Sequence, residues 1–295
     1  MKPNYLAAGL VACLAFPSLG LADVTSFELA DTTAGKELPR AADGRSADLL
    51  SAFLGLDSMP RQANAICRGA MGLDGMPVIF STEIDHTTLQ AGDFRVISRS
   101  GVQGRMHCVS FLPATDAGEL RTVLLIGEFG PADSDPAARV EVIGHLHSID
   151  GALDFKGAAV DVTPLAPGPT LIVAERYDPA IPDAGLGVRR TKGSDCPAQG
   201  TEQAVRVVWA GGVTLANGDE PGDAERQLYS VTVQAADGTQ RDIAPMALAD
   251  LGDGDNNHLL CLDTTDRPVA VAFPAGVLQD PNGDLNPQTT VRLHP

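Results

Sequence analysis

The fold class is decided by the stretch Pro77-Val-Ile-Phe-Ser-Thr-Glu-Ile-Asp-His-Thr-Thr-Leu-Gln-Ala-Gly-Asp-Phe-Arg-Val-Ile-Ser-Arg-Ser-Gly101. Two apolar segments with alternating side chains flank a polar segment that is rich in turn-forming Asp, Thr and Gly. Alternation with a period of two is typical of a β-strand with one buried face. The stretch therefore predicts strand, turn and strand, with four side chains facing a core: Val78, Phe80, Phe94 and Val96.

Similar segments recur along the rest of the chain. Short apolar runs, separated by Gly and Pro turns, lie at 106–112, 121–130, 139–147, 159–163, 170–175, 204–213, 227–233, 257–262 and 268–273. Regular short strands with such turns predict an all-β protein built as an antiparallel β-sandwich. The run 123–126 is apolar throughout, so it is predicted to be a central strand that is buried on both faces.

One segment departs from this pattern. Residues 46–56 carry Ser46, which could cap a helix, and Asp48 in what would be its first turn. Apolar residues recur through the segment, and Pro60 follows it. We expect one short N-terminal helix here, within a lead-in segment that spans 23–60.

The first 22 residues have the features of an export signal. Lys2 precedes an apolar run, and Gly20-Leu21-Ala22 resembles the small-residue site at which a signal peptide is cleaved. The run is too short for a membrane span, and no later apolar stretch reaches the roughly 18 residues that a span needs. A second interpretation stays open, because Leu10-Val-Ala-Cys13 also resembles the box before a lipid-anchored cysteine. Either interpretation predicts a protein of the periplasm, the cell surface or the medium.

The chain is strongly acidic. It has 38 Asp and Glu residues against 21 Lys and Arg, which gives a net charge of −17. Removal of residues 1–22 would leave a mature charge of about −18, because Lys2 is their one charged side chain. Such a surface disfavours nucleic acids and anionic membranes, which both bind through Lys and Arg. The expected partner is an unidentified protein or cell-envelope component.

The cysteines predict two disulfides. Four remain if Cys13 leaves with the signal, and an even number in an exported chain favours pairing. Three connectivities are possible for four cysteines. We favour the arrangement that keeps each pair within one half of the chain: Cys67 with Cys108, and Cys196 with Cys261.

The strand rhythm is lost between residues 178 and 203, around Cys196. This irregular stretch predicts a domain boundary near residue 195. It would divide the chain into a first β-domain at 61–195 and a second at 196–295. In the other interpretation, 196–295 completes the first domain.

Two parts of the chain resemble bacterial Ig-like domains of surface-layer and adhesin-type proteins. The stretch 77–101 is similar to their opening, with a strand that ends in Phe-Ser, an acidic turn and a Phe-x-Val strand. Residues 269–293 are similar to their closing strands and the turn between them. The resemblance implies Ig-like sandwiches with structural or adhesive roles. Because one such domain has roughly 100 residues, the separation implies two sandwiches or one with a large insertion.

A tight acidic loop near the C-terminus is a candidate calcium site. Oxygen-bearing side chains occupy alternate positions there, namely Asp280, Asn282, Asp284 and Asn286. Calcium takes six to eight oxygen ligands, and alternate positions of a turn suit it. The loop departs from the helix-loop-helix calcium motif at Leu285 and Val291, and the same residues also favour a plain turn. A second acidic loop, with Asp250, Asp253, Asp255 and Asn256, could complete a site if the two loops meet.

His145-Leu-His147 is a second candidate. On a strand both rings would face one side, where they could hold zinc or copper with a third ligand. The sequence lacks the Gly-x-Ser-x-Gly and His-Glu-x-x-His motifs of hydrolases. We therefore expect an exported, non-enzymatic binding or structural module, with calcium as its one expected cofactor. The alternative is a metal-dependent enzyme or a transition-metal-binding protein that uses His145 and His147.

Overall fold

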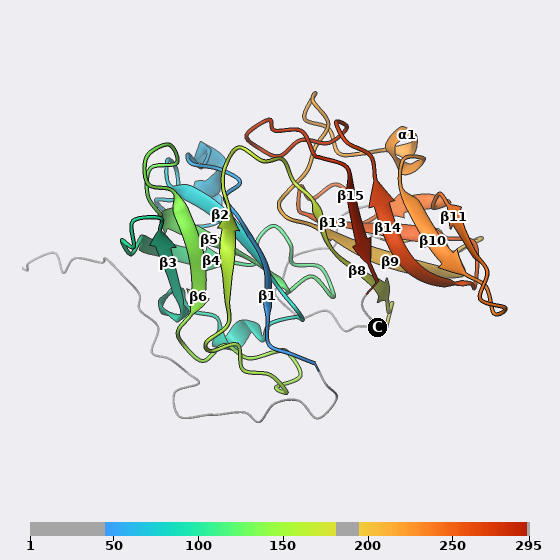
Figure 1. Cartoon of the computed structure of the whole chain (residues 1–295), viewed down its shortest axis with the longest axis horizontal. Helices are drawn as coiled ribbons and strands as arrows, with labels where there is room; N and C mark the ends of the chain where they lie inside the picture. Colours follow the sequence, from blue (N-terminus) through green and yellow to red (C-terminus); the bar gives the residue numbers. More distant parts are fainter. Residues whose placement is uncertain (1–44, 181–194, 294–295) are drawn as a thin grey trace, which may run out of the picture.

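The computed structural model describes residues 45–180 and 195–293. They form two β units that lie side by side, the first blue to green in Figure 1 and the second yellow to red. The all-β prediction is confirmed. The predicted signal segment, the lipid-anchor alternative at Cys13 and the first part of the lead-in, 23–44, lie outside the described residues.

The first unit contains seven strands. They are β1 (Leu49–Phe53), β2 (Asp74–Phe80), β3 (Phe94–Ser98), β4 (Arg105–Ser110), β5 (Thr122–Glu128), β6 (Ala137–Val142) and β7 (Ala159–Thr163). Their order is β3-β6-β7-β1-β2-β5-β4. The pair β1–β7 is parallel, and the other pairs of this unit are antiparallel. Three 3₁₀ helices lie in its connections: η1 (Arg61–Ala65), η2 (His86–Thr88) and η3 (Ala91–Asp93).

The stretch 77–101 forms β2, a turn with η2 and η3, and β3. The Asp85 carboxylate caps η2 by accepting a hydrogen bond from the Thr87 backbone N–H at 2.9 Å. The four side chains predicted to face the core, Val78, Phe80, Phe94 and Val96, are all buried in one apolar cluster. The Phe80 ring packs edge-on against Phe155, with centroids 5.0 Å apart. This part of the sequence prediction is confirmed.

The predicted helix at 46–56 is wrong. Residues 49–53 form β1, which pairs with β2 on one side and β7 on the other. Leu49 faces the core of the first unit, whereas Leu50 packs against the second unit. A bulge between Leu49 and Ser51 shifts the register. A strand that is buried on both faces lacks clean alternation, so its apolar spacing imitates that of a helix.

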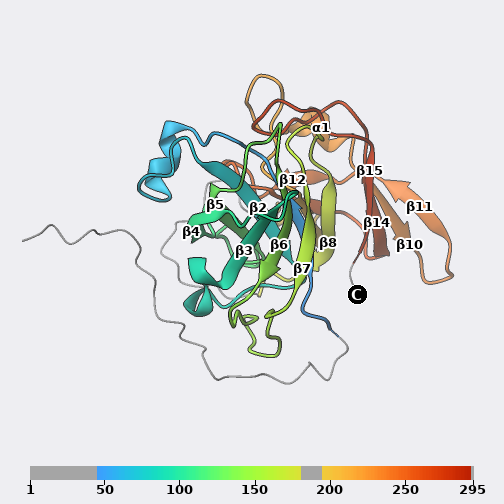
Figure 2. The same ribbon diagram turned by 60° about the vertical axis from the view of Figure 1, so that its left-hand side comes forward.

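The second unit is a sandwich of two four-stranded sheets, in the orders β11-β10-β14-β15 and β12-β13-β9-β8. Its strands are β8 (Leu171–Tyr177), β9 (Gln203–Trp209), β10 (Ser230–Gln234), β11 (Gln240–Ile243), β12 (Ala247–Ala249), β13 (Asn257–Leu262), β14 (Arg267–Phe273) and β15 (Thr289–Arg292), with the short helix α1 (Asp223–Arg226). Figure 2 shows β8 between the first unit and the sheet edge at β15. The Trp209 ring packs edge-on against Phe273 in the core, with centroids 5.4 Å apart.

The domain boundary predicted near residue 195 is also wrong. Strand β8 pairs with β9 along its length, so it belongs to the second unit. The boundary lies between Thr163 and Leu171, where β7 ends and β8 begins. The first unit in turn begins with β1 rather than at residue 61. Residues 178–202 connect β8 to β9, two strands of one unit, so loss of strand rhythm in a sequence does not by itself mark a boundary between domains.

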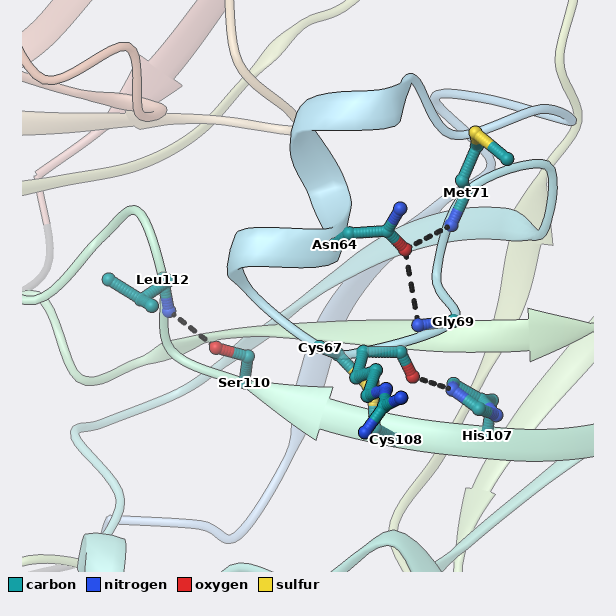
Figure 3. Close-up of a disulfide and its surroundings, with 9 residues drawn as sticks. Asn64, Cys67, Gly69, Met71, His107, Cys108, Ser110 and Leu112 are labelled. Atoms are coloured by element: carbon teal, nitrogen blue, oxygen red, sulfur yellow. Dashed lines mark hydrogen bonds between the residues drawn. A yellow bond between two sulfur atoms is a disulfide. The ribbon is translucent and has the colours of Figure 1, made fainter.

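Both disulfides join residues within one unit, in the pairing that the sequence favoured. Cys67, in the connection after η1, bonds to Cys108 of β4 (Figure 3). The Asn64 side-chain oxygen accepts hydrogen bonds from the backbone N–H groups of Gly69 and Met71, which holds the loop beside this disulfide. In the second unit, Cys196 bonds to Cys261 of β13.

The two units meet face to face through the sheets that contain β1–β2 and β8–β9, and we call this interface the seam. Its apolar part consists of Ile79, Val173 and Val208, with Leu50 and Ile172 packed against them. Along β2 and β9 these residues alternate with residues of the unit cores, as the period of a strand requires. The central strands at the seam, such as β2 and β9, are therefore buried on both faces.

Candidate functional site

The sequence-predicted calcium loop lies between β14 and β15. One oxygen of Asp280 accepts hydrogen bonds from the backbone N–H groups of Asn282 and Asp284, each at 2.9 Å. The other Asp280 oxygen is buried without a hydrogen-bond partner. The side-chain amide of Asn282 donates to Asp284 at 2.8 Å. These contacts close a turn of the kind that Asp and Asn stabilise on their own.

Asn286 is committed to the backbone. Its side-chain oxygen accepts hydrogen bonds from the backbone N–H groups of Val277 and Leu278, at 3.0 and 2.9 Å. Its amide nitrogen donates to the carbonyl oxygens of Pro274 and Pro287. A carbonyl oxygen has two lone pairs, and both are used here. The four-residue calcium site at 280–286 stays a prediction, and Asn286 contributes to it only if these bonds break.

The two histidines lie beside a carboxylate, Asp154, that the sequence did not single out. His145 Nδ1 is 2.7 Å from an Asp154 oxygen, and His147 Nε2 is 4.0 Å from the same oxygen. Neither histidine lies on β6, which ends at Val142. The Lys156 ammonium lies 2.8 Å from His145 Nε2, so both ring nitrogens of His145 have neighbours. His147 Nε2 is buried without a hydrogen-bond partner.

A denser group of charged side chains lies in the seam, around Arg206 of β9. This guanidinium is 1% exposed. It donates to the carbonyl oxygen of Ala117 in the first unit at 2.7 Å and lies over the Tyr177 ring at 4.9 Å. A Cβ atom on Gly118 would come within 2.0 Å of Arg206 Nη1, so glycine at this position permits the approach.

Carboxyl groups from both units lie beside Arg206 or beside the carboxylates that it approaches. Asp116 and Glu119 come from the connection between β4 and β5, and Asp250 and Asp253 from that between β12 and β13. One oxygen each of Asp116, Asp250 and Asp253 lies within 4.8 Å of the other two. Arg206 Nη2 is 3.9 Å from both Glu119 and Asp250. We call Asp116, Glu119, Asp250 and Asp253 the seam carboxylates.

Burial makes three carboxyl groups here costly to ionise, those of Glu119, Asp253 and Asp255. It raises the pKa of Glu119 well above its usual value, and the neighbouring Asp255 and Asp250 add repulsion. Burial likewise raises the pKa of Asp253 to about 6 and that of Asp255 to about 8. A carboxylate removed from water without a compensating cation loses its solvation. The seam therefore favours any species that neutralises negative charge.

Other polar contacts join the units around this group. Arg121 of the first unit donates to Glu175 of β8 at 2.6 Å. The Asn256 amide donates to the Trp209 carbonyl within its own unit at 2.7 Å and to the Thr122 hydroxyl of the first unit at 3.2 Å. The charged part of the seam thus has fixed geometry on both sides.

Sequence reasoning found part of this group. It named Asp250, Asp253, Asp255 and Asn256 as a second acidic loop that could contribute calcium ligands. Both oxygens of Asp255 accept hydrogen bonds from Asn257, and Asn256 joins the units through its amide. Sequence reasoning missed Asp116, Glu119 and Arg206, because their distance along the chain gives no local motif.

In the part of the chain that the structure describes, no helix is long and apolar enough to cross a membrane.

No protein-family model matches the chain, and no curated protein sequence matches it either. Among solved structures, the N-terminal part of the bacterial S-layer protein SbsC is 12% identical, with 86% of this chain and 45% of that chain covered and a TM-score of 0.30. A second SbsC structure, residues 31–844, is 12% identical, with 79% and 42% covered and a TM-score of 0.29. The chain spans less than half the length of these surface-layer proteins, and similarity at this level does not establish a shared fold.

Proposed function

We propose that this protein is an exported, non-enzymatic structural module whose two β units act as one rigid piece. The seam is the observation that supports this proposal. It buries apolar side chains from both units and holds Arg206 of one unit against the backbone of the other. Two domains that moved freely would expose the apolar side chains of the seam to water, which is unfavourable.

The Ig-like character of the units is part of the proposal, and strand order supports it. Constant-type Ig domains place strands A, B, E and D on one sheet and C, F and G on the other. With β1 to β7 as A to G, the first unit has this order, and β1 and β7 join its two halves. The second unit repeats it, with β8 as A, β9 as B and β11 as an added strand beside β10.

Export is supported by the cysteines and by the leading segment. Both disulfides require an oxidising compartment to persist. The acidic surface favours solubility and disfavours nucleic acids. The partner that fits these properties is another component of the cell envelope, and calcium is the cofactor that suits oxygen-rich acidic loops.

Hydrogen exchange measured by mass spectrometry in increasing urea tests whether the units form one piece. Peptides from β2 and β5 report on the first unit, and peptides from β9 and β13 on the second. We expect the slowest amides of both sets to open at the same urea concentration. Separate midpoints in the wild-type protein would contradict the proposal, because independent domains unfold independently.

A second candidate function rests on the approach of His145 and His147 to Asp154. Two imidazoles and a carboxylate are a ligand set that zinc accepts in catalytic sites. Zinc would have to displace the Lys156 ammonium from His145. Elemental analysis of the purified protein, with His147→Ala as the control, tests it. One equivalent of zinc that is lost in the variant would favour this function over a purely structural one.

A further inference from the structure

We infer that the seam carboxylates bind one calcium ion, held by Asp116 of the first unit and by Asp250 and Asp253 of the second, with Glu119 beside them. The inference rests on the proposed function, because it gives the rigid two-unit module a cation that joins its halves. This calcium site lies elsewhere than the one predicted from the sequence. Its ligands come from the β4–β5 and β12–β13 connections rather than from residues 280–286.

The spacing of the oxygens suits an ion of this size. Calcium lies 2.3–2.6 Å from its oxygen ligands, so two ligands on opposite sides of one ion are about 5 Å apart. The oxygens of Asp116, Asp250 and Asp253 lie within 4.8 Å of one another. One ion can therefore reach all three with small adjustments of the side chains.

The carboxylate of Asp250 points independently to a cation at this place. The residue is 2% exposed, and neither of its carboxylate oxygens accepts a hydrogen bond. Its nearest cationic group, Arg206 Nη2, is 3.9 Å away, beyond hydrogen-bonding distance. Glu119 donates to it only when protonated, a state that its raised pKa favours and that a bound cation would replace. Buried carboxylates are normally paired, hydrogen-bonded or bound to a metal, and a cation would give Asp250 a closer partner than Arg206 at 3.9 Å.

The charges around the group favour a divalent cation. Arg206 is the cation in contact with Glu119 and Asp250, and Arg121 is engaged with Glu175. One guanidinium thus lies within 4 Å of two of the four seam carboxylates. Protonation of the carboxylates is the other way to remove the excess negative charge. Neutral carboxyl groups, however, lack the strong ionic interactions that can offset the cost of burying them.

The donor atoms distinguish calcium from other metals. All of them are carboxylate oxygens, which suit hard cations, whereas zinc and copper prefer nitrogen and sulfur ligands. The ligands come from two separate loops, and calcium tolerates the irregular geometry that results better than magnesium does. The half-buried position of Asp253 gives an ion access from solvent.

The second loop is held in place without the ion. The Glu220 carboxylate accepts hydrogen bonds from the backbone N–H groups of Gly252 and Gly254, on either side of Asp253. Asp255 and Asn257 fix the strand end that follows. The loop is therefore prepared for a ligand, which lowers the entropy that binding would cost.

Calcium binding to the mature, chelator-treated chain tests the inference. We expect titration calorimetry to give one calcium site, and the melting temperature to rise by about 5–10 °C at one hundred times the Kd. Magnesium at the same concentration should give a smaller shift. No binding and no shift with the wild-type protein at millimolar calcium would overturn the inference.

Three variants locate the site. Asp250→Asn and Asp253→Asn should each abolish the calcium-dependent shift, and Asp253→Asn serves if the more buried variant does not fold. Asp284→Asn is the matched control, an equal change in the other acidic loop, and should keep the full shift. If Asp284→Asn alone loses the shift, the ion lies in the 280–286 loop and the inference is wrong. The hydrogen-exchange experiment in calcium-free buffer measures separately whether the two units unfold together. Its result tests the proposed function independently of calcium binding.

Discussion

Arg206 Nη2 donates to the carbonyl oxygen of Ala117 at 2.7 Å, so a side chain of the second unit holds the backbone of the first. The contact depends on the next residue, Gly118, whose backbone has a φ of +89° and whose missing Cβ leaves room for the guanidinium. One short loop therefore determines whether the charged part of the seam can form.

Gly118→Ala should destabilise the protein by about 2–4 kcal/mol. About 1 kcal/mol comes from placing a side chain at positive φ, and the rest from displacing the buried guanidinium of Arg206. Gly283→Ala is the matched control, because Gly283 has the same φ of +89° with nothing within 4 Å of an added Cβ. Urea unfolding measures both variants. Equal losses would show that the close approach to Arg206 has no energetic weight.

Arg206→Met should cost about 3–5 kcal/mol in calcium-free buffer. Removing one partner of a buried charged group leaves the others without compensation, here Glu119 and Asp250. Arg206→Lys keeps the charge but lacks the planar group that lies over Tyr177. It should therefore lose less stability than Arg206→Met does. Chemical denaturation compares the two variants. If methionine is tolerated as well as lysine, the seam does not need a positive charge here.

His258 should make the protein less stable as the pH falls from about 6.5 towards 4. Burial lowers the pKa of His258 to about 4, whereas the unfolded chain has a value near 6.5. The unfolded state therefore binds one more proton in this window, and stability is lost as pH decreases, by up to about 3 kcal/mol in all. The neutral ring accepts the Tyr229 hydroxyl at Nδ1, a bond that a proton on Nδ1 would break.

The control for this prediction is His258→Asn, which cannot titrate but can still accept from Tyr229. Carboxyl groups elsewhere affect both proteins alike, so the comparison isolates one group. The free energy of unfolding measured by urea at several pH values should fall less steeply with acid in the variant. Parallel curves for the two proteins would mean that His258 takes up its proton at the same pH in the folded and unfolded states.

The sequence predicted the strands best where one face meets a core and the other meets solvent or a loop. Strand β3 follows that rule, because Phe94 and Val96 are buried in the core whereas Arg95 and Ile97 between and beyond them are half-buried. The prediction failed at β1, where Leu49 faces the core and Leu50 faces the seam. Burial of both faces removes the alternation that distinguishes a strand from a helix.

The candidate site shows a second limit. Asp250 and Asp253 lie in an acidic loop that is visible in the sequence, whereas Asp116 and Glu119 lie more than a hundred residues earlier. No local spacing links them, because their proximity comes from the packing of two separate units. A site that forms between domains is predictable only once the face that each domain buries is known.

The apolar part of the seam should couple the units measurably. Ile79 of β2 and Val208 of β9 belong to one buried cluster across the seam. Ile79→Ala alone should cost about 2–5 kcal/mol. In a double-mutant cycle with Val208→Ala, we expect an interaction energy of roughly 0.5–3 kcal/mol. The control cycle pairs Ile79→Ala with Val231→Ala, because Val231 lies in the core of the second unit. The free-energy changes of these two variants should be additive within about 0.5 kcal/mol. Additivity in both cycles would mean that the units share a surface without stabilising one another, and the rigid-module proposal would lose its energetic basis.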